Sequence, residues 1–160
     1  MNFINDRNLA LRFRDNAVPS KERFLYFIFS MVLATILTTS IAVAPLYKET
    51  INNFDVISDL IYLASVIVGV IACYTTNKNG DGKEFIERMI CIGFPVMIIT
   101  FLISFFASIF YFMITTAFDW HKPADVTTVY DLPPVLFSTL YYYWRLNSSI
   151  RIAAGVRREA

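Results

Sequence analysis

The chain alternates between long apolar stretches and short polar intervals. Residues 24–47 form one apolar stretch, residues 56–74 a second, and residues 85–117 a third that is most strongly apolar from Met89 to Phe112. A helix of about 20 apolar residues crosses a hydrocarbon core of about 30 Å. The pattern therefore predicts three transmembrane helices.

A fourth segment is shorter, because residues 133–146 give only about 21 Å of helix. Pro133 and Pro134 favour a first helical turn. After Arg145, polar and apolar residues mix, which suggests that the helix continues to about residue 152. We therefore expect an all-α bundle of four transmembrane helices in a single domain, with a leader at residues 1–23 and a tail at residues 153–160.

Lysine and arginine predict the orientation of these spans. If all four cross and the N-terminus is cytoplasmic, twelve basic residues lie inside and only Lys48 and Lys122 lie outside. Cytoplasmic segments of membrane proteins carry such an excess, and the opposite orientation would invert the ratio. We predict a multi-pass protein of the plasma membrane, in a bacterium the inner membrane, with both termini in the cytoplasm.

Composition supports a membrane protein and excludes other classes. Apolar residues make up 56% of the chain and charged residues 17%, against about a quarter charged in soluble domains. A net charge of +1 argues against a nucleic-acid partner, which needs a concentrated basic surface. Cys73 and Cys91 lie in apolar stretches, without the spacing of a disulfide framework or a zinc site.

Small residues at four-residue spacing allow helices to approach closely in lipid. The first two spans carry such a candidate packing face, which predicts a tight inner seam between them: Ser30, Ala34, Thr38, Ala42, Ser65, Gly69 and Cys73. In the third span, Pro95 predicts a kink. The phenylalanines of that span are expected to face lipid or a second subunit: Phe101, Phe105, Phe106, Phe110 and Phe112.

The turn at residues 79–82 separates the second and third spans. Its sequence, Asn-Gly-Asp-Gly, favours positive φ angles, and Asp81 with Glu84 three residues later forms a capping-box pattern for the third helix. Glu84 is then expected to pair with Arg88. The segment from Asn77 faintly imitates a calcium loop, but Arg88 stands where that loop requires a glutamate, so we interpret it as a turn.

The leader alternates apolar and polar residues at positions 9–14. This period suits a short strand or an interfacial segment, and a tail that docks on a partner is a further alternative. We leave the three open.

Ionisable residues near hydrocarbon are candidates for function. Asp55 and Asp59 could form an acidic outer mouth or simply favour a helix N-terminus. Arg145 could snorkel to the headgroups or pair with Glu87. These four residues are the candidate intramembrane or pore residues.

The segment at residues 119–125 holds the one histidine of the chain. Asp119, His121 and Asp125 could hold a metal or sense pH, but we expect a solvated loop with Trp120 as an interfacial anchor. We predict no metal, no cofactor and, without a nucleophile–base set, no enzyme activity.

These patterns favour a membrane-embedded, homo-oligomeric anchor or sensor subunit that recruits a cytosolic or membrane protein at its inner face, in a setting such as envelope stress or defence against phage. The candidate partner surface is basic: Arg12, Arg14, Lys78, Lys83, Arg151, Arg157 and Arg158. The alternatives are an ion-channel or small-transporter subunit, and an immunity protein against a pore-forming toxin.

Overall fold

The computed structural model describes residues 4–38, 52–117 and 128–156, and these residues contain helices and no strand. The elements are α1 (Asp6–Arg14), α2 (Ser20–Thr38), α4 (Asn53–Lys78), α5 (Phe85–Ala117), the short 3₁₀ helix η2 (Val129–Asp131) and α6 (Leu132–Ala153). The bounds of α5 match the prediction, and those of α6 differ from it by one residue at each end.

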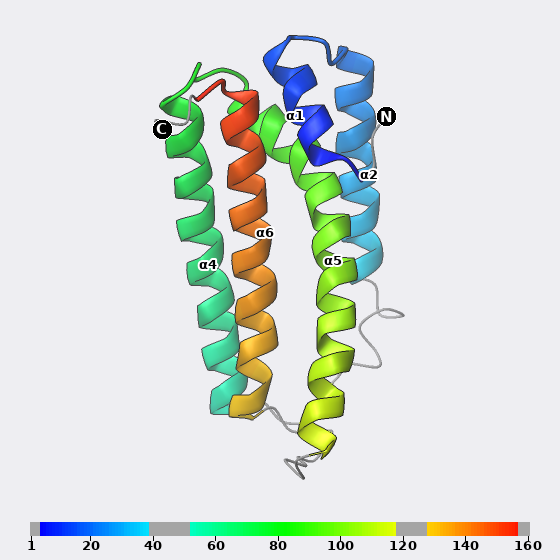
Figure 1. The fold of residues 1–160 in the computed structure, drawn as a ribbon, viewed down its shortest axis with the longest axis vertical. Helices are drawn as coiled ribbons and strands as arrows, with labels where there is room; N and C mark the ends of the chain where they lie inside the picture. Colours follow the sequence, from blue (N-terminus) through cyan, green and yellow to red (C-terminus); the bar gives the residue numbers. More distant parts are fainter. Residues whose placement is uncertain (1–3, 39–51, 118–127, 157–160) are drawn as a thin grey trace.

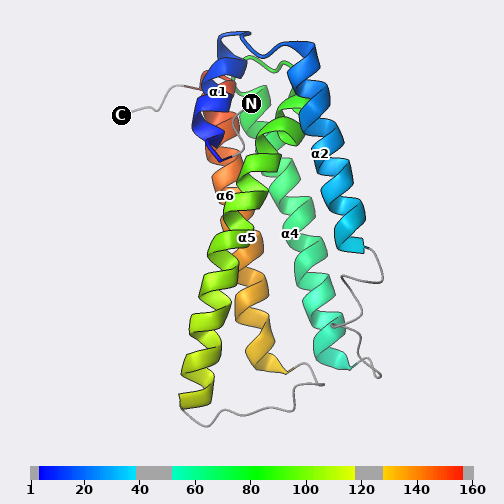
Figure 2. The ribbon, with the colours of Figure 1, turned by 90° about the vertical axis from the view of Figure 1, so that its right-hand side faces the viewer.

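Four long helices run along the long axis, and α1 lies at one end of them, beside the α4–α5 connection and the end of α6 (Figures 1 and 2). Along the axis, α4 packs against α6, α5 packs against α6, and α2 packs against α5. The short helix α1 packs on both α5 and α6. This end is where the chain concentrates its buried residues.

The small face of α4 packs against α6. A Cβ on Gly69 would lie 2.2 Å from Cγ of Tyr143, so this glycine admits the tyrosine ring. Cys73, one turn later, is fully buried. Among the described residues, α2 packs on α5, so the α4 half of the predicted packing face meets α6 rather than α2.

On α2, the Ser30 hydroxyl donates a hydrogen bond to the Tyr26 carbonyl at 2.8 Å within the same helix. The side chains of Ala34 and Thr38, and Ala42 as a whole, lie outside the described residues. That half of the predicted packing face stays a prediction.

Helix α5 continues through Pro95, which has no amide hydrogen to donate to the carbonyl of Cys91. Figure 1 shows the first turns of α5 running obliquely beneath α1 before the helix follows the long axis. The oblique part contains the most buried stretch of the helix, from Cys91 to Val96. The remainder is largely exposed.

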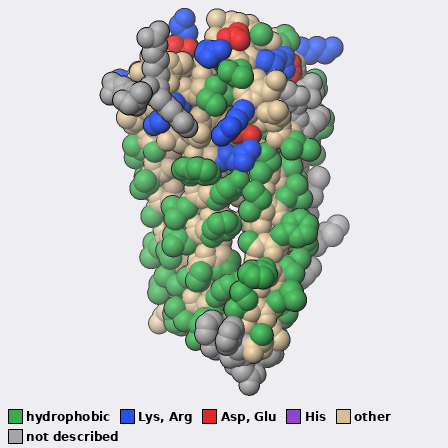
Figure 3. All heavy atoms as spheres, in the orientation of Figure 1, with side chains coloured by type: hydrophobic (Ala, Val, Ile, Leu, Met, Phe, Trp, Pro, Cys, Tyr) green, Lys and Arg blue, Asp and Glu red, His purple; other side chains and the backbone are tan. Residues whose placement is uncertain are grey.

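Two of the described helices, α4 and α5, are long and apolar enough to cross a membrane, with mean hydropathy of 2.3 and 2.5 over their most apolar windows. The five phenylalanines singled out in α5 expose between 53% and 69% of their surface. Figure 3 shows charged side chains gathered near α1 and apolar side chains covering the rest of that face. Exposed apolar helices of this length indicate association with a membrane.

Candidate functional site

Ion pairs gather at the end of the molecule that carries α1. We define the polar cap as the residues that make these pairs between helices or turns: Asp6, Arg12, Glu22, Arg23, Asp81, Glu84, Glu87, Arg88 and Arg145. They come from α1, the beginnings of α2 and α5, the turn between α4 and α5, and α6. The polar cap thus joins parts of the chain that are far apart in sequence.

Helix α1 docks on the bundle through one face. Its N-cap, Asn5, accepts a hydrogen bond from the Asn8 amide at 2.9 Å, and Leu9, Ala10 and Phe13 are fully buried. The strand alternative for the leader is therefore wrong. The segment docks on its own chain, where it covers α5 and α6.

Asp6 anchors the beginning of α1 to α6. This carboxylate is 2% exposed and accepts hydrogen bonds from Nη2 of Arg145 at 2.8 Å and from Oγ of Ser149 at 2.6 Å. Nη1 of Arg145 donates to the Tyr141 hydroxyl at 3.0 Å. Of the two alternatives for Arg145, the pair with Glu87 is therefore wrong, because the buried Asp6 carboxylate is its partner.

Arg12 and Glu22 join the end of α1 to the beginning of α2. Nη1 and Nη2 of Arg12 donate to the two carboxylate oxygens at 2.7 and 2.6 Å, which is the strong bidentate geometry. The hydrogen bond from Arg12 lowers the pKa of Glu22 below its ordinary value, against the opposing effect of burial. The pair closes the turn between the two helices.

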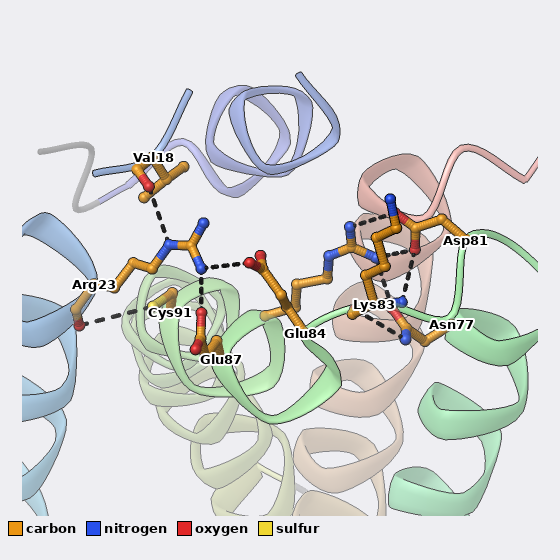
Figure 4. A network of polar contacts seen from close by, with 9 residues as sticks. Val18, Arg23, Asn77, Asp81, Lys83, Glu84, Glu87 and Cys91 are labelled. Carbon is orange, nitrogen blue, oxygen red and sulfur yellow. Dashed lines mark hydrogen bonds and ion pairs between the residues drawn. The ribbon is translucent and has the colours of Figure 1, made fainter. Parts of the chain in front are cut away.

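Arg23 connects three segments of the polar cap (Figure 4). Its Nε donates to the Val18 carbonyl at 3.0 Å, and its Nη1 lies 2.9 Å from Oε1 of Glu84 and also contacts Glu87. The guanidinium lies 5.1 Å from the ring centroid of Phe13, within cation–π range. Arg23 thereby holds α1, α2 and α5 in register.

Arg88 is the most deeply buried cation of the described residues, with 1% exposure. Its Nη1 and Nη2 donate to the two oxygens of Asp81 at 2.5 and 2.7 Å, and Nη1 also donates to Oδ1 of Asn77 at 2.9 Å. The hydrogen bond from Arg88 lowers the pKa of Asp81. Two oxygen ligands of the imitated calcium loop thus bind a guanidinium.

The predicted capping box of the third helix is wrong. Oδ1 of Asp81 accepts from the Lys83 amide at 3.1 Å, while Glu84 adopts a φ of 48° immediately before α5. Because Glu84 is in this left-handed conformation, its side chain reaches Arg23 rather than Arg88. Tertiary ion pairs have replaced the local pairs that the spacing favoured.

The turn between α4 and α5 closes against the end of α6. The Asp81 amide donates to the Ala154 carbonyl at 3.0 Å, and a Cβ on Gly80 would lie 2.3 Å from that carbonyl oxygen. Only glycine permits this approach. The turn and the end of α6 therefore form one surface.

The four candidate pore residues do not come together. Asp55 completes a capping box, accepting the Asn52 amide at 2.9 Å, so its helix N-terminus interpretation is confirmed. Asp59 is exposed on α4, about 28 Å along the helix from Lys78 at 1.5 Å per residue. Glu87 and Arg145 belong to the polar cap with different partners.

The basic residues proposed for a partner surface divide into three groups. Arg12 is used within the polar cap, whereas Arg14, Lys78, Lys83 and Arg151 are exposed. Arg157 and Arg158 lie outside the described residues. The exposed members lie on α1, the α4–α5 turn and the end of α6, around the polar cap.

Within the described ranges, no group of three or more His, Cys, Asp or Glu side chains is placed to hold a metal ion. The segment with Asp119, Trp120, His121 and Asp125 lies outside those ranges. The metal and pH-sensor alternatives for it stay untested.

Asp6, Asn77 and Ser149 provide buried polar contacts of the polar cap, and none of the three was among the predicted site residues. For Asp6 a signal existed: Asp6, Leu9, Ala10 and Phe13 follow the i, i+3, i+4, i+7 spacing of one helix face. The alternation at positions 9–14 masked it. Nothing local in the sequence connects Ser149 with Asp6, 143 residues away.

Comparison with known proteins adds no relative: no family model, no curated protein and no solved structure matches this chain.

Proposed function

We propose that this chain is a four-span membrane protein, with both ends in the cytoplasm, that serves as an anchor or sensor subunit for another protein at its inner face. The observation that carries the proposal is the polar cap: each of its charged side chains makes an ion pair with another member, while exposed basic side chains surround it. Exposed cations on a surface that ion pairs hold in one conformation suit recognition of an acidic partner.

Two further features support this proposal. The excess of lysine and arginine near the polar cap supports a cytoplasmic position for it. The exposed apolar surfaces of α4 and α5 suit lipid or a second copy of the chain, in keeping with a homo-oligomer in a bacterial inner membrane. An envelope-stress or phage-defence setting remains part of the proposal.

The channel alternative has less support. A pathway lined by Asp59 and Arg145 would need groups at both ends of the bundle, whereas Arg145 forms a partly buried ion pair with Asp6. Substituting Asp59→Asn should leave ion flux through liposomes unchanged. Loss of a wild-type flux would reverse this ranking.

Photo-crosslinking in cells tests the anchor function. A photoreactive residue at position 78 or 83, both exposed beside the polar cap, should form adducts with one protein partner, while the same residue at position 59 should not. Removing residues 147–160 would be a poor test, because Ser149, Ile150 and Ala153 are buried. Adducts with lipid alone, or equal protein adducts at position 59, would reject the proposal.

Topology is tested with a single new cysteine. Lys83→Cys should react with an impermeant maleimide only after the membrane is opened, because the native Cys73 and Cys91 are 0% and 2% exposed and add little background. Labelling in intact cells would reverse the orientation.

A further inference from the structure

A polar pocket lies on the surface between α1 and α6, apart from the ion pairs of the polar cap. It encloses about 440 Å³ and is lined by Arg7, Trp144, Asn147, Ser148, Arg151, Ile152 and Val156. On α6, residues 144, 148 and 151 follow the spacing of one helix face. Arg7 closes the pocket from the first turn of α1.

The pocket carries positive charge that no described acidic side chain neutralises. Neither Arg7 nor Arg151 makes an ion pair with any other described residue. The nearby Asp6 carboxylate already accepts hydrogen bonds from Arg145 and Ser149. Two free guanidinium groups at one pocket favour a phosphate, which they bind with planar, paired hydrogen bonds.

The pocket also offers an acceptor that lacks a donor. Oδ1 of Asn147 is buried and has no hydrogen-bond partner among the described residues. Burying an amide oxygen without a hydrogen bond is unfavourable, and a ligand hydroxyl that donates to Oδ1 would remove that cost. The ligand chemistry is therefore a phosphate diester that also carries a hydroxyl group.

Trp144 places this chemistry at a membrane surface. Its side chain is 69% exposed at the rim of the pocket, and tryptophan concentrates at the level of lipid headgroups. Below it, along α6, Phe137 and Leu140 are exposed apolar residues, where an acyl chain would lie. A charged pocket at the end of α6 followed by an apolar surface toward its beginning matches the arrangement of headgroup and acyl chains in a phospholipid.

We propose that this pocket binds the headgroup of an anionic, hydroxyl-bearing phospholipid such as phosphatidylglycerol. The phosphate lies between Arg7 and Arg151, and a headgroup hydroxyl donates to Oδ1 of Asn147. The inference rests on the membrane association of the proposed function, but not on its protein partner. Because Arg7 and Trp144 belong to different helices, the bound lipid also holds α1 on α6.

The test uses the full chain with Trp120→Phe, which leaves Trp144 as its single tryptophan. In nanodiscs, the fluorescence of Trp144 is quenched by brominated phosphatidylglycerol or by brominated phosphatidylcholine in turn. We expect at least tenfold preference for phosphatidylglycerol. Arg7→Gln with Arg151→Gln should abolish it, since each cation near an anionic surface contributes about fivefold.

The matched control is Lys78→Gln with Lys83→Gln, which removes the same charge away from the pocket and should keep the preference. Asn147→Leu supplies a second variant with unchanged charge, and it should reduce the preference severalfold. Equal loss in the lysine control would show a general surface effect and reject the site. If millimolar inorganic phosphate displaces the brominated lipid, the pocket binds free phosphate and the proposal of a lipid ligand is rejected.

If the Trp120→Phe protein shows no lipid preference while Lys83→Cys still reacts with maleimide only after the membrane is opened, this inference alone is rejected and the proposed function stands.

Discussion

The polar cap and the remainder of the bundle are built from different interactions. We call the remainder the shaft: residues 53–73 of α4, 96–117 of α5 and 132–144 of α6. In the polar cap, carboxylates and guanidinium groups from separate segments meet at 2.5–2.9 Å. In the shaft, an aromatic ring of α6 fills the space left by a glycine of α4, and much of the surface is apolar and exposed.

This difference shows where the order of the molecule comes from. Ion pairs with buried members are specific, because a displaced partner leaves an uncompensated charge. Apolar packing in lipid is less selective, since the lipid chains are as apolar as the side chains. The ion pairs of the polar cap therefore specify how α1, α2, the α4–α5 turn, α5 and α6 meet at that end, whereas apolar packing joins α4 and α5 to α6 along the shaft.

The largest expected effect comes from removing the partner of Arg88. Asp81→Ala leaves a guanidinium of 1% exposure without the carboxylate that binds it, and an uncompensated buried charge costs about 3–5 kcal/mol; the 34% exposure of the Asp81 side chain places the expected loss at the lower end of that range. Unfolding in mixed detergent, followed by circular dichroism, measures this. Asp15→Ala, which removes the exposed partner of Arg14, should change stability by less than about 0.5 kcal/mol. Equal effects would remove the distinction between buried and surface pairs.

The next largest effect concerns the docking of α1. Asp6→Ala removes the acceptor of Arg145 and Ser149, and hydrogen bonds to charged groups contribute about 1.5–3 kcal/mol each. We expect α1 amides to exchange hydrogen at least tenfold faster, while α4 amides exchange unchanged. The control is Leu11→Ala, on the exposed side of the same helix. Uniform acceleration across all helices would mean that α1 and the shaft unfold together.

A substitution in the shaft sharpens the comparison from the other side. Gly69→Ala places a Cβ against the Tyr143 ring, and such overpacking costs about 1–3 kcal/mol. Val68→Ala, on the exposed neighbour, is the matched control. Unfolding curves in detergent should separate the two. If Gly69→Ala is neutral, α4 and α6 are packed more loosely than the structure describes.

Acidification should loosen the polar cap before the shaft, with the smallest effect of the four. Partners hold the pKa values of Glu22 and Asp81 below their ordinary values of 4.5 and 3.8. Their stabilisation is therefore complete above those values and is lost as pH falls through the lower folded-state values. Proteolysis of the α1–α2 turn should increase between pH 5 and pH 3, and Glu22→Gln should weaken this dependence. A faster cleavage at high pH would contradict the assignment.

The helices of the shaft could be predicted from the sequence because their signals are local. Thirty-three residues from Phe85 to Ala117 are apolar with few interruptions, and the prolines at 133 and 134 stand in the first turn of α6. Apolar length and proline geometry act within one segment. No knowledge of neighbouring helices was needed.

The polar cap could not be predicted because its pairs are tertiary. Spacing favoured Glu84 with Arg88, yet Glu84 takes a φ of 48° and meets Arg23. The partner of Arg145 lies 139 residues away in sequence, beyond any local rule. In the leader, the spacing of Asp6, Leu9, Ala10 and Phe13 indicated the helix that is present. The same residues also alternate between apolar and polar, as in a strand, and the short apolar face of the helix was the weaker signal.

The contact between Asp6 and Arg145 has a consequence for biosynthesis. At about 5–20 residues per second, the ribosome needs roughly 7–28 seconds to add the 139 residues between them. During that time Leu9 and Phe13 have no α6 to cover them. A nascent chain arrested before residue 145 therefore exposes two apolar side chains that chaperones and proteases recognise. The newly made protein ceases to be their substrate when its first helix docks on its last.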